Sequence, residues 1–156
     1  MGAGTPRELS MLTFLEFFAT FSCALFAGAA LYINVVEHPA RMQLETRHAA
    51  AQWAPSYRRA TWMQAPLALL ALASGAGAWL AGGTLAWLSA ALLIGAVVPI
   101  TFALIMPTNH RLLEPGRDLN SAQTRALLER WNRLHALRTA LSLLATCVFI
   151  WASLGG

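Results

Sequence analysis

Three residues near the start of the last apolar stretch are spaced to share one face of a helix. Trp131, His135 and Arg138 lie at positions i, i+4 and i+7 of a continuous segment. At membrane depth, polar side chains are costly and usually functional. A neutral imidazole there can take up a proton, a guanidinium can hold an oxyanion, and an indole can stack on an aromatic ring. This face therefore predicts chemistry on a planar, apolar substrate.

A second polar face closes the first apolar stretch. Asn34, Glu37, His38 and Arg41 occur at i, i+3, i+4 and i+7, so a helix would again align them. Pro39 disfavours helical geometry at His38, and we expect the helix to end or kink there. Glu37 and His38 should then lie at the edge of the membrane.

The composition requires a membrane. Of 156 residues, 57% are hydrophobic and only 12% are charged, with a mean hydropathy of +0.52. A soluble domain carries roughly 25% charged residues. The net charge of +4 comes from arginines that flank apolar segments, which indicates membrane topology rather than nucleic-acid binding. We therefore predict an integral membrane protein of the all-α class.

The apolar segments predict one transmembrane domain over residues 1–156, an up-down four-helix bundle. Residues 41–60 are polar and are expected to form a loop, with an interfacial helix carrying His48, Trp53 and Tyr57 as the alternative for part of it. Gly82 and Gly83 predict a tight turn, Pro99 a kink, and Asn120 or Ser121 a helix N-cap. The last helix would extend from the membrane into the cytoplasm. The expected spans are about 11–36, 61–81, 84–106 and 133–154.

The arginines predict the orientation. The loops after spans one and three are rich in arginine, whereas the opposite side of the membrane offers only Arg7. By the positive-inside rule these two loops are cytoplasmic and both termini lie outside, with a bacterial inner membrane as the expected location. The arginines of the two loops and of the start of the last helix are Arg41, Arg47, Arg58, Arg59, Arg111, Arg117, Arg125, Arg130 and Arg133.

This topology brings the polar residues to one depth. Span one ends, span three ends and span four begins on the same side, so Asn109 and His110 after span three join the two polar faces described above. Arg138 lies several residues inside its span, and Glu37 is its natural ion partner, with Glu16 as the alternative. The alternative, purely structural interpretation is that these residues end helices, cap them or belong to the aromatic belt at the membrane interface.

A metal site is the competing interpretation. His38, His110 and His135 come from three helices and suit a first-row metal such as zinc or copper, or haem ligation. No local spacing of histidines supports it. A non-catalytic membrane scaffold is the third hypothesis. Small residues at 27–30 and 75–77 allow close helix contact and predict a homo-oligomer.

Three segments resemble the anthrone-oxygenase-like family of small four-span membrane proteins. They are N-V-V-E-H-P-A-R at 34–41, P-T-N at 107–109 and W-N-R-L-H-A-L-R at 131–138. The resemblance implies a four-helix membrane bundle. For the polyketide-pathway branch it implies oxygenation of an anthrone to an anthraquinone with O2 and no recognised cofactor. By position, the pocket residues it implies are Asn109, Trp131, His135 and Arg138.

The expected function is oxidation of a hydrophobic phenol- or quinol-like molecule that enters from the bilayer and reacts with O2. His135 or His38 would take a proton, Arg138 and Asn109 would stabilise the anion, and Trp131 would stack on the ring. The predicted catalytic residues are His135, His38, Arg138 and Asn109. The predicted substrate-binding residues are Trp131, Asn34 and Glu37.

Overall fold

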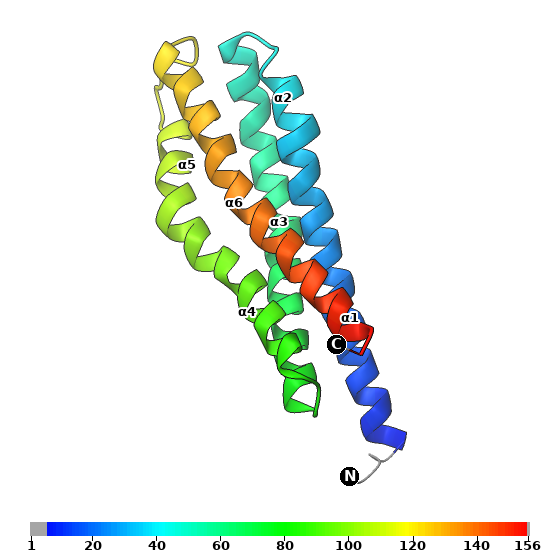
Figure 1. The fold of residues 1–156 in the computed structure, drawn as a ribbon. Helices are drawn as coiled ribbons and strands as arrows, with labels where there is room; N and C mark the ends of the chain where they lie inside the picture. Colours follow the sequence, from blue (N-terminus) through cyan, green and yellow to red (C-terminus); the bar gives the residue numbers. More distant parts are fainter. Residues whose placement is uncertain (1–5, 156) are drawn as a thin grey trace.

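The computed structural model describes residues 6–155. Its helices join into four long rods that pack side by side (Figure 1): α1 to α2, then α3, then α4 to α5, and last α6. The first rod packs on the second and fourth, and the third packs on the same two. The loops after the first and third rods lie at one end of the bundle, which is the predicted all-α, up-down arrangement (Figure 1). The elements are α1 (Pro6–Tyr32), η1 (Ile33–Glu37), α2 (His38–Arg41), α3 (Thr46–Leu80), α4 (Leu85–Ile100), η2 (Thr101–Ile105), α5 (Met106–Leu112) and α6 (Ala122–Ser153).

The chain is an integral membrane protein by the length and hydropathy of these rods. Within the described residues, four helical segments are long and apolar enough to cross a bilayer. Large apolar side chains such as Phe14, Phe17, Trp62 and Phe102 are exposed on the outside of the bundle, where lipid would cover them. The four segments are Met11–Arg41, Thr46–Leu80, Leu85–Leu112 and Ala122–Ser153.

The first rod does not end before Pro39, so of the two expected outcomes, a stop or a kink, the stop is wrong. It passes through the π-helical turn η1 and continues as α2 to Arg41. Pro39 is accommodated because it lies in the first turn of α2, where a missing N–H is tolerated. This continuity keeps Glu37, His38 and Arg41 on a rigid helix rather than on a loop.

The prediction of a polar loop over residues 41–60 is wrong. Only residues 42–45 connect the rods, and α3 runs from Thr46 through Pro55 and Pro66 to Leu80. The polar side chains misled the prediction because one face of this amphipathic stretch is buried, with Ala49, Ala50 and Trp53 inside. At 35 residues α3 is as long as α6, so α6 does not extend beyond the bundle alone.

Two local predictions are confirmed, whereas the kink at Pro99 stays a prediction. Pro99 lies inside α4, and the π-helical segment η2 begins two residues later at Thr101. Ser121 is the N-cap of α6, because its hydroxyl accepts a hydrogen bond from the Thr124 backbone N–H at 3.2 Å. Gly82 has φ +100° in the turn between α3 and α4, a conformation that favours glycine.

Replacing Gly75 by alanine should destabilise the bundle. A Cβ at Gly75 would lie 2.8 Å from two ring carbons of Phe149 and 3.0 Å from the Ala91 Cβ, all inside the core. Overpacking of this kind costs about 1–3 kcal/mol. Gly28 is the control, since a Cβ added there would meet nothing within 4 Å and alanine favours a helix. Thermal unfolding in detergent should show a lower Tm for Gly75→Ala only; equal Tm values would contradict the packing.

Candidate functional site

Two buried imidazoles flank one indole at the loop end of the bundle. The Trp131 ring lies 4.8 Å from the His135 ring on the same helix and 5.4 Å from the His38 ring of α2, centroid to centroid. Trp53 of α3 meets Trp131 edge-on at 5.8 Å. All four side chains are buried. Since these neighbours enclose Trp131, its ring serves to hold the two histidines in place.

The hydrogen bonds of Asn34 determine which nitrogen of His135 carries a hydrogen. The Asn34 amide Nδ2 donates to the backbone carbonyl of Asn132 at 3.1 Å and to its side-chain oxygen at 2.7 Å. The Asn34 Oδ1 must therefore accept, and it does so from His135 Nδ1 at 2.9 Å and from the Thr139 hydroxyl. In a neutral imidazole this leaves His135 Nε2 as the basic nitrogen.

Replacing Asn34 by leucine should therefore lower the turnover number of any reaction that uses His135 as its base by roughly 10- to 100-fold, because His135 loses the acceptor that fixes its tautomer and orientation. KM should change much less. Asn132→Leu is the control, since the Asn132 backbone carbonyl still anchors Asn34. Steady-state kinetics would compare kcat of the two variants. An equal loss of kcat in Asn34→Leu and Asn132→Leu would argue against the positioning role of Asn34.

His38 is in a different environment. Arg41 Nη1 lies 3.3 Å from His38 Nδ1, and a guanidinium can only donate, so this nitrogen accepts. Arg41 is itself buried and pairs with Glu37 on the same helix. It also contacts Gln52 at 2.5 Å and Ser56 at 3.2 Å on α3. This network joins α2 to α3 and occupies the basic nitrogen of His38, which leaves His135 as the better proton acceptor.

Arg138 does not pair with Glu37, contrary to the expectation from sequence. Its Nη2 donates to the Gln64 side-chain oxygen at 2.8 Å, and its guanidinium carbon lies 5.3 Å from the centre of the Phe26 ring. Among the described residues no carboxylate is within ion-pairing distance of Arg138. The side chain is partly buried in a membrane span, so its positive charge is uncompensated.

A small inner cavity connects these groups. Its volume is about 20 Å³, and Trp53, Gln64, Trp131, His135 and Arg138 are among its lining residues. An outer pocket of about 120 Å³ lies between α3 and α4 and is mostly apolar, with Phe26, Phe102 and Met106 in its wall. The two share Tyr57, Thr61 and Arg138. Arg138 therefore lies at the boundary between a pocket of apolar character and the cavity beside His135.

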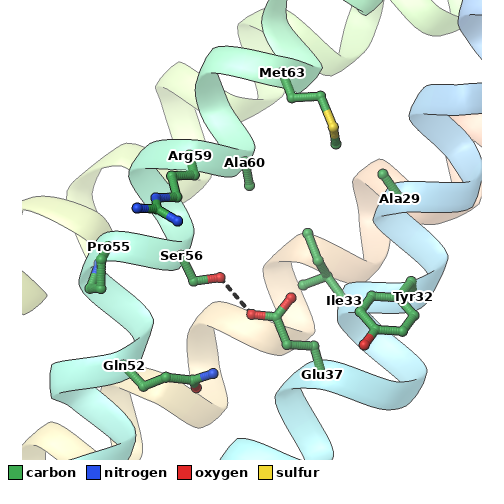
Figure 2. A pocket seen from close by; sticks show the side chains of 10 residues that line it. All are labelled: Ala29, Tyr32, Ile33, Glu37, Gln52, Pro55, Ser56, Arg59, Ala60 and Met63. Carbon is green, nitrogen blue, oxygen red and sulfur yellow. Dashed lines mark hydrogen bonds between the residues drawn. The ribbon is translucent and has the colours of Figure 1, made fainter.

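A second opening lies on the other side of α3. This groove of about 560 Å³ runs between α1 and α3, and Figure 2 shows Glu37 reaching from α1's continuation towards Ser56 on α3. The Ser56 hydroxyl donates to the Glu37 carboxylate at 2.5 Å. Tyr32, Arg59 and Met63 also line the groove. Glu37 thus lies at a separate opening rather than beside Arg138.

Two predicted site residues lie apart from this cluster. Asn109 is buried on α5, where its amide contacts the Met106 sulfur at 4.0 Å, and it lines neither the inner cavity nor the outer pocket. His110 is exposed. The three histidines of the metal hypothesis are therefore not assembled, and within residues 6–155 no group of three potential ligands of that kind is placed to hold a metal ion.

Sequence reasoning missed the contribution of α3. Trp53, Tyr57 and Gln64 all line the inner cavity, and Gln52 and Ser56 complete the Arg41 network. The spacing of Trp53, Tyr57 and Gln64, at i, i+4 and i+11, was a usable signal because it places them on one helical face. Gln64 was a second signal, as an amide inside an apolar stretch.

The chain was compared with known proteins. No curated protein and no solved structure matches it. A family model described as anthrone oxygenase matches residues 53–148, which include most of α3, all of α4 and α5, and most of α6. The match contains Gln64, Trp131, His135 and Arg138, whereas Asn34 and His38 precede it. Because the model covers more than half of the sequence, the chain belongs to the anthrone oxygenase family.

Proposed function

We propose that this protein is a membrane oxygenase that oxidises a hydrophobic phenol- or quinol-like molecule of the anthrone type with O2. The observation that carries the proposal is the uncompensated Arg138 at the boundary between the outer pocket and the cavity beside His135. A cation without a counter-ion in a membrane protein suits an anionic intermediate. The apolar wall of the outer pocket suits a planar ring that arrives from the bilayer.

In the proposed reaction, His135 Nε2 removes a proton from the activated CH2 group of the substrate. Arg138 stabilises the negative charge that develops on the conjugated oxygen. The substrate anion gives one electron to O2, and the resulting radical and superoxide combine to form a C–O bond. The peroxide takes the proton back from His135 and then loses water together with the second C–H proton. The balance is one CH2 and one O2 converted to one C=O and one water.

Several residues have supporting roles in this proposal. Asn34 fixes His135, and Trp131 separates and orients the two histidines. Tyr57 and Thr61 line both spaces and would contact the substrate ring. His38 and Glu37 act through Arg41 to hold α2 against α3. We assign no step to Asn109, which contacts the Met106 sulfur and lines neither space.

The test is a turnover assay with the detergent-purified protein and a panel of anthrones, naphthols and alkyl quinols. O2 uptake and quinone absorbance are followed together. We expect uptake that depends on the substrate, with one O2 consumed per quinone formed and the highest rate for a tricyclic CH2 substrate. Rates equal to the protein-free control for every member of the panel would contradict the proposal.

We further propose that the end of the bundle carrying this site faces the cytoplasm of a bacterial inner membrane. The arginines gather at this end, in the loop after the third rod and on the helices that flank both loops, whereas Arg7 is near the opposite end and its side chain lies outside the described residues. A C-terminal alkaline phosphatase fusion should be active and a fluorescent-protein fusion dark. The reverse pattern would invert the orientation.

A homo-oligomer also remains part of the proposal. Gly75 and Gly77 form helix contacts within one molecule, against Phe149 and Leu15, so they are not free to contact a second copy. Gly28 is exposed on α1 with open space around it, so this face is where a second copy would pack closely.

A further inference from the structure

The inner cavity contains an excess of hydrogen-bond donors. Four buried N–H groups on its lining residues have no partner among the described residues. Buried polar groups of this kind are rare because each unmade hydrogen bond costs about 1–3 kcal/mol. The four groups are Arg138 Nε, Gln64 Nε2, Trp53 Nε1 and Trp131 Nε1.

The acceptors left around the same cavity are fewer than the donors: they are His135 Nε2 and the hydroxyl oxygens of Tyr57 and Thr61. The Gln64 oxygen accepts from Arg138, and because arginine can only donate, this bond leaves the Gln64 NH2 group as the unpartnered end. The Ser56 hydroxyl accepts from Arg41 and donates to Glu37. The Tyr57 hydroxyl lies 3.8 Å from the Met106 sulfur. A ligand in this cavity would therefore meet donors and few acceptors.

The charges of the side chains around the inner cavity also favour an anionic ligand. Arg41 also lines the cavity, but Glu37 neutralises it. Arg138 has no carboxylate partner in the described part of the chain. One water molecule could accept two of these hydrogen bonds and donate to His135 Nε2, but it would leave the charge of Arg138 uncompensated. A compact anion accepts more bonds and supplies the missing negative charge.

We propose that the inner cavity is a binding site for one compact monovalent anion, held by Arg138, Gln64, Trp53 and Trp131. Its volume of about 20 Å³ is close to the space that one water-sized molecule needs, which excludes sulfate and phosphate. Two sources share this chemistry: a dissolved halide in the resting protein, and the superoxide formed from O2 during turnover. The second source rests on the proposed function, whereas the first does not.

The first arm of the test measures binding without any assay of activity. Purified protein is titrated with sodium bromide against sodium gluconate at equal ionic strength, and Tm and tryptophan fluorescence are recorded. We expect a saturable, bromide-specific rise in Tm and a bromide anomalous-scattering peak between Arg138 and Gln64 in crystals. A response identical to that in gluconate, with no such peak, would overturn the site.

Matched variants locate the effect. Trp53→Phe keeps an aromatic ring but removes one donor, and we expect bromide affinity to fall roughly 10- to 100-fold, the loss of about one hydrogen bond to a charged group. Trp87→Phe is the control, because Trp87 is equally buried but packs against Phe149 in a different cluster. Gln64→Met should weaken binding like Trp53→Phe. Equal affinity in all variants would overturn the assignment.

The second arm separates the two sources in a protein with turnover. If superoxide uses the cavity, bromide raises KM for O2 while KM for the organic substrate stays unchanged. Bromide that binds but competes with neither substrate identifies a resting halide site and overturns the superoxide source alone. A protein that turns over but does not bind bromide keeps the proposed function and loses this inference.

Discussion

Replacing Arg138 by methionine is expected to lower kcat about 100- to 1000-fold without unfolding the protein. Both the outer pocket and the inner cavity are lined by this guanidinium, so its loss removes the charge that stabilises the substrate anion. Methionine fills similar space in apolar surroundings. Because the charge has no carboxylate partner among the described residues, its removal should leave Tm equal or raise it.

The combination of the two readouts makes this prediction specific. A residue that merely supports the fold would lose activity and Tm together. Arg133→Met is the control, since Arg133 lies on the same helix but is exposed. Full activity in Arg138→Met, or the same loss in Arg133→Met, would remove Arg138 from the mechanism.

Replacing His135 by alanine is expected to abolish turnover, with a loss of roughly 100- to 10,000-fold. His135 is the imidazole that lines the inner cavity, and Asn34 leaves its Nε2 as the basic nitrogen. His135→Gln serves as a second variant that retains a polar side chain under Trp131. It should be as inactive as alanine while preserving more of the packing, which circular dichroism and Tm would report.

His110→Gln is the matched control for His135. His110 is exposed and distant from the described cluster, so its replacement should leave kcat unchanged. Loss of activity in both His110 and His135 variants, accompanied by loss of a bound metal, would revive the three-histidine hypothesis. Retained activity in His135→Ala would remove the proposed base.

Much of the fold could be predicted because a membrane span requires a long, uninterrupted apolar segment, which is visible in the sequence. Length and hydropathy indicated the four rods, and their alternation placed the polar ends together. The contact of Trp131 with His38 and His135 followed from this topology and helical spacing. The role of Ser121 as N-cap followed from its side-chain chemistry.

The rest depended on details that spacing does not contain. The partners of Glu37 and Arg138 are decided by rotamers and by α3, whose polar first half resembles a loop in composition. His110 was expected in the cluster, but the π-helical segment η2 precedes it. A π-turn inserts one residue and rotates the following helical face by about 100°, so residues after it cannot be placed by α-helical spacing.

The most direct test of the oxygenase proposal is the origin of the new oxygen atom in the product. Turnover of a tricyclic anthrone under ¹⁸O2 in ordinary water, with mass spectrometry at early times, should give a quinone that carries one ¹⁸O atom and release the second ¹⁸O as water. The label should be absent with Arg138→Met and His135→Ala under the same conditions. A product whose new oxygen is unlabelled, and therefore comes from water, or labelling no faster than in the protein-free control, would contradict the account.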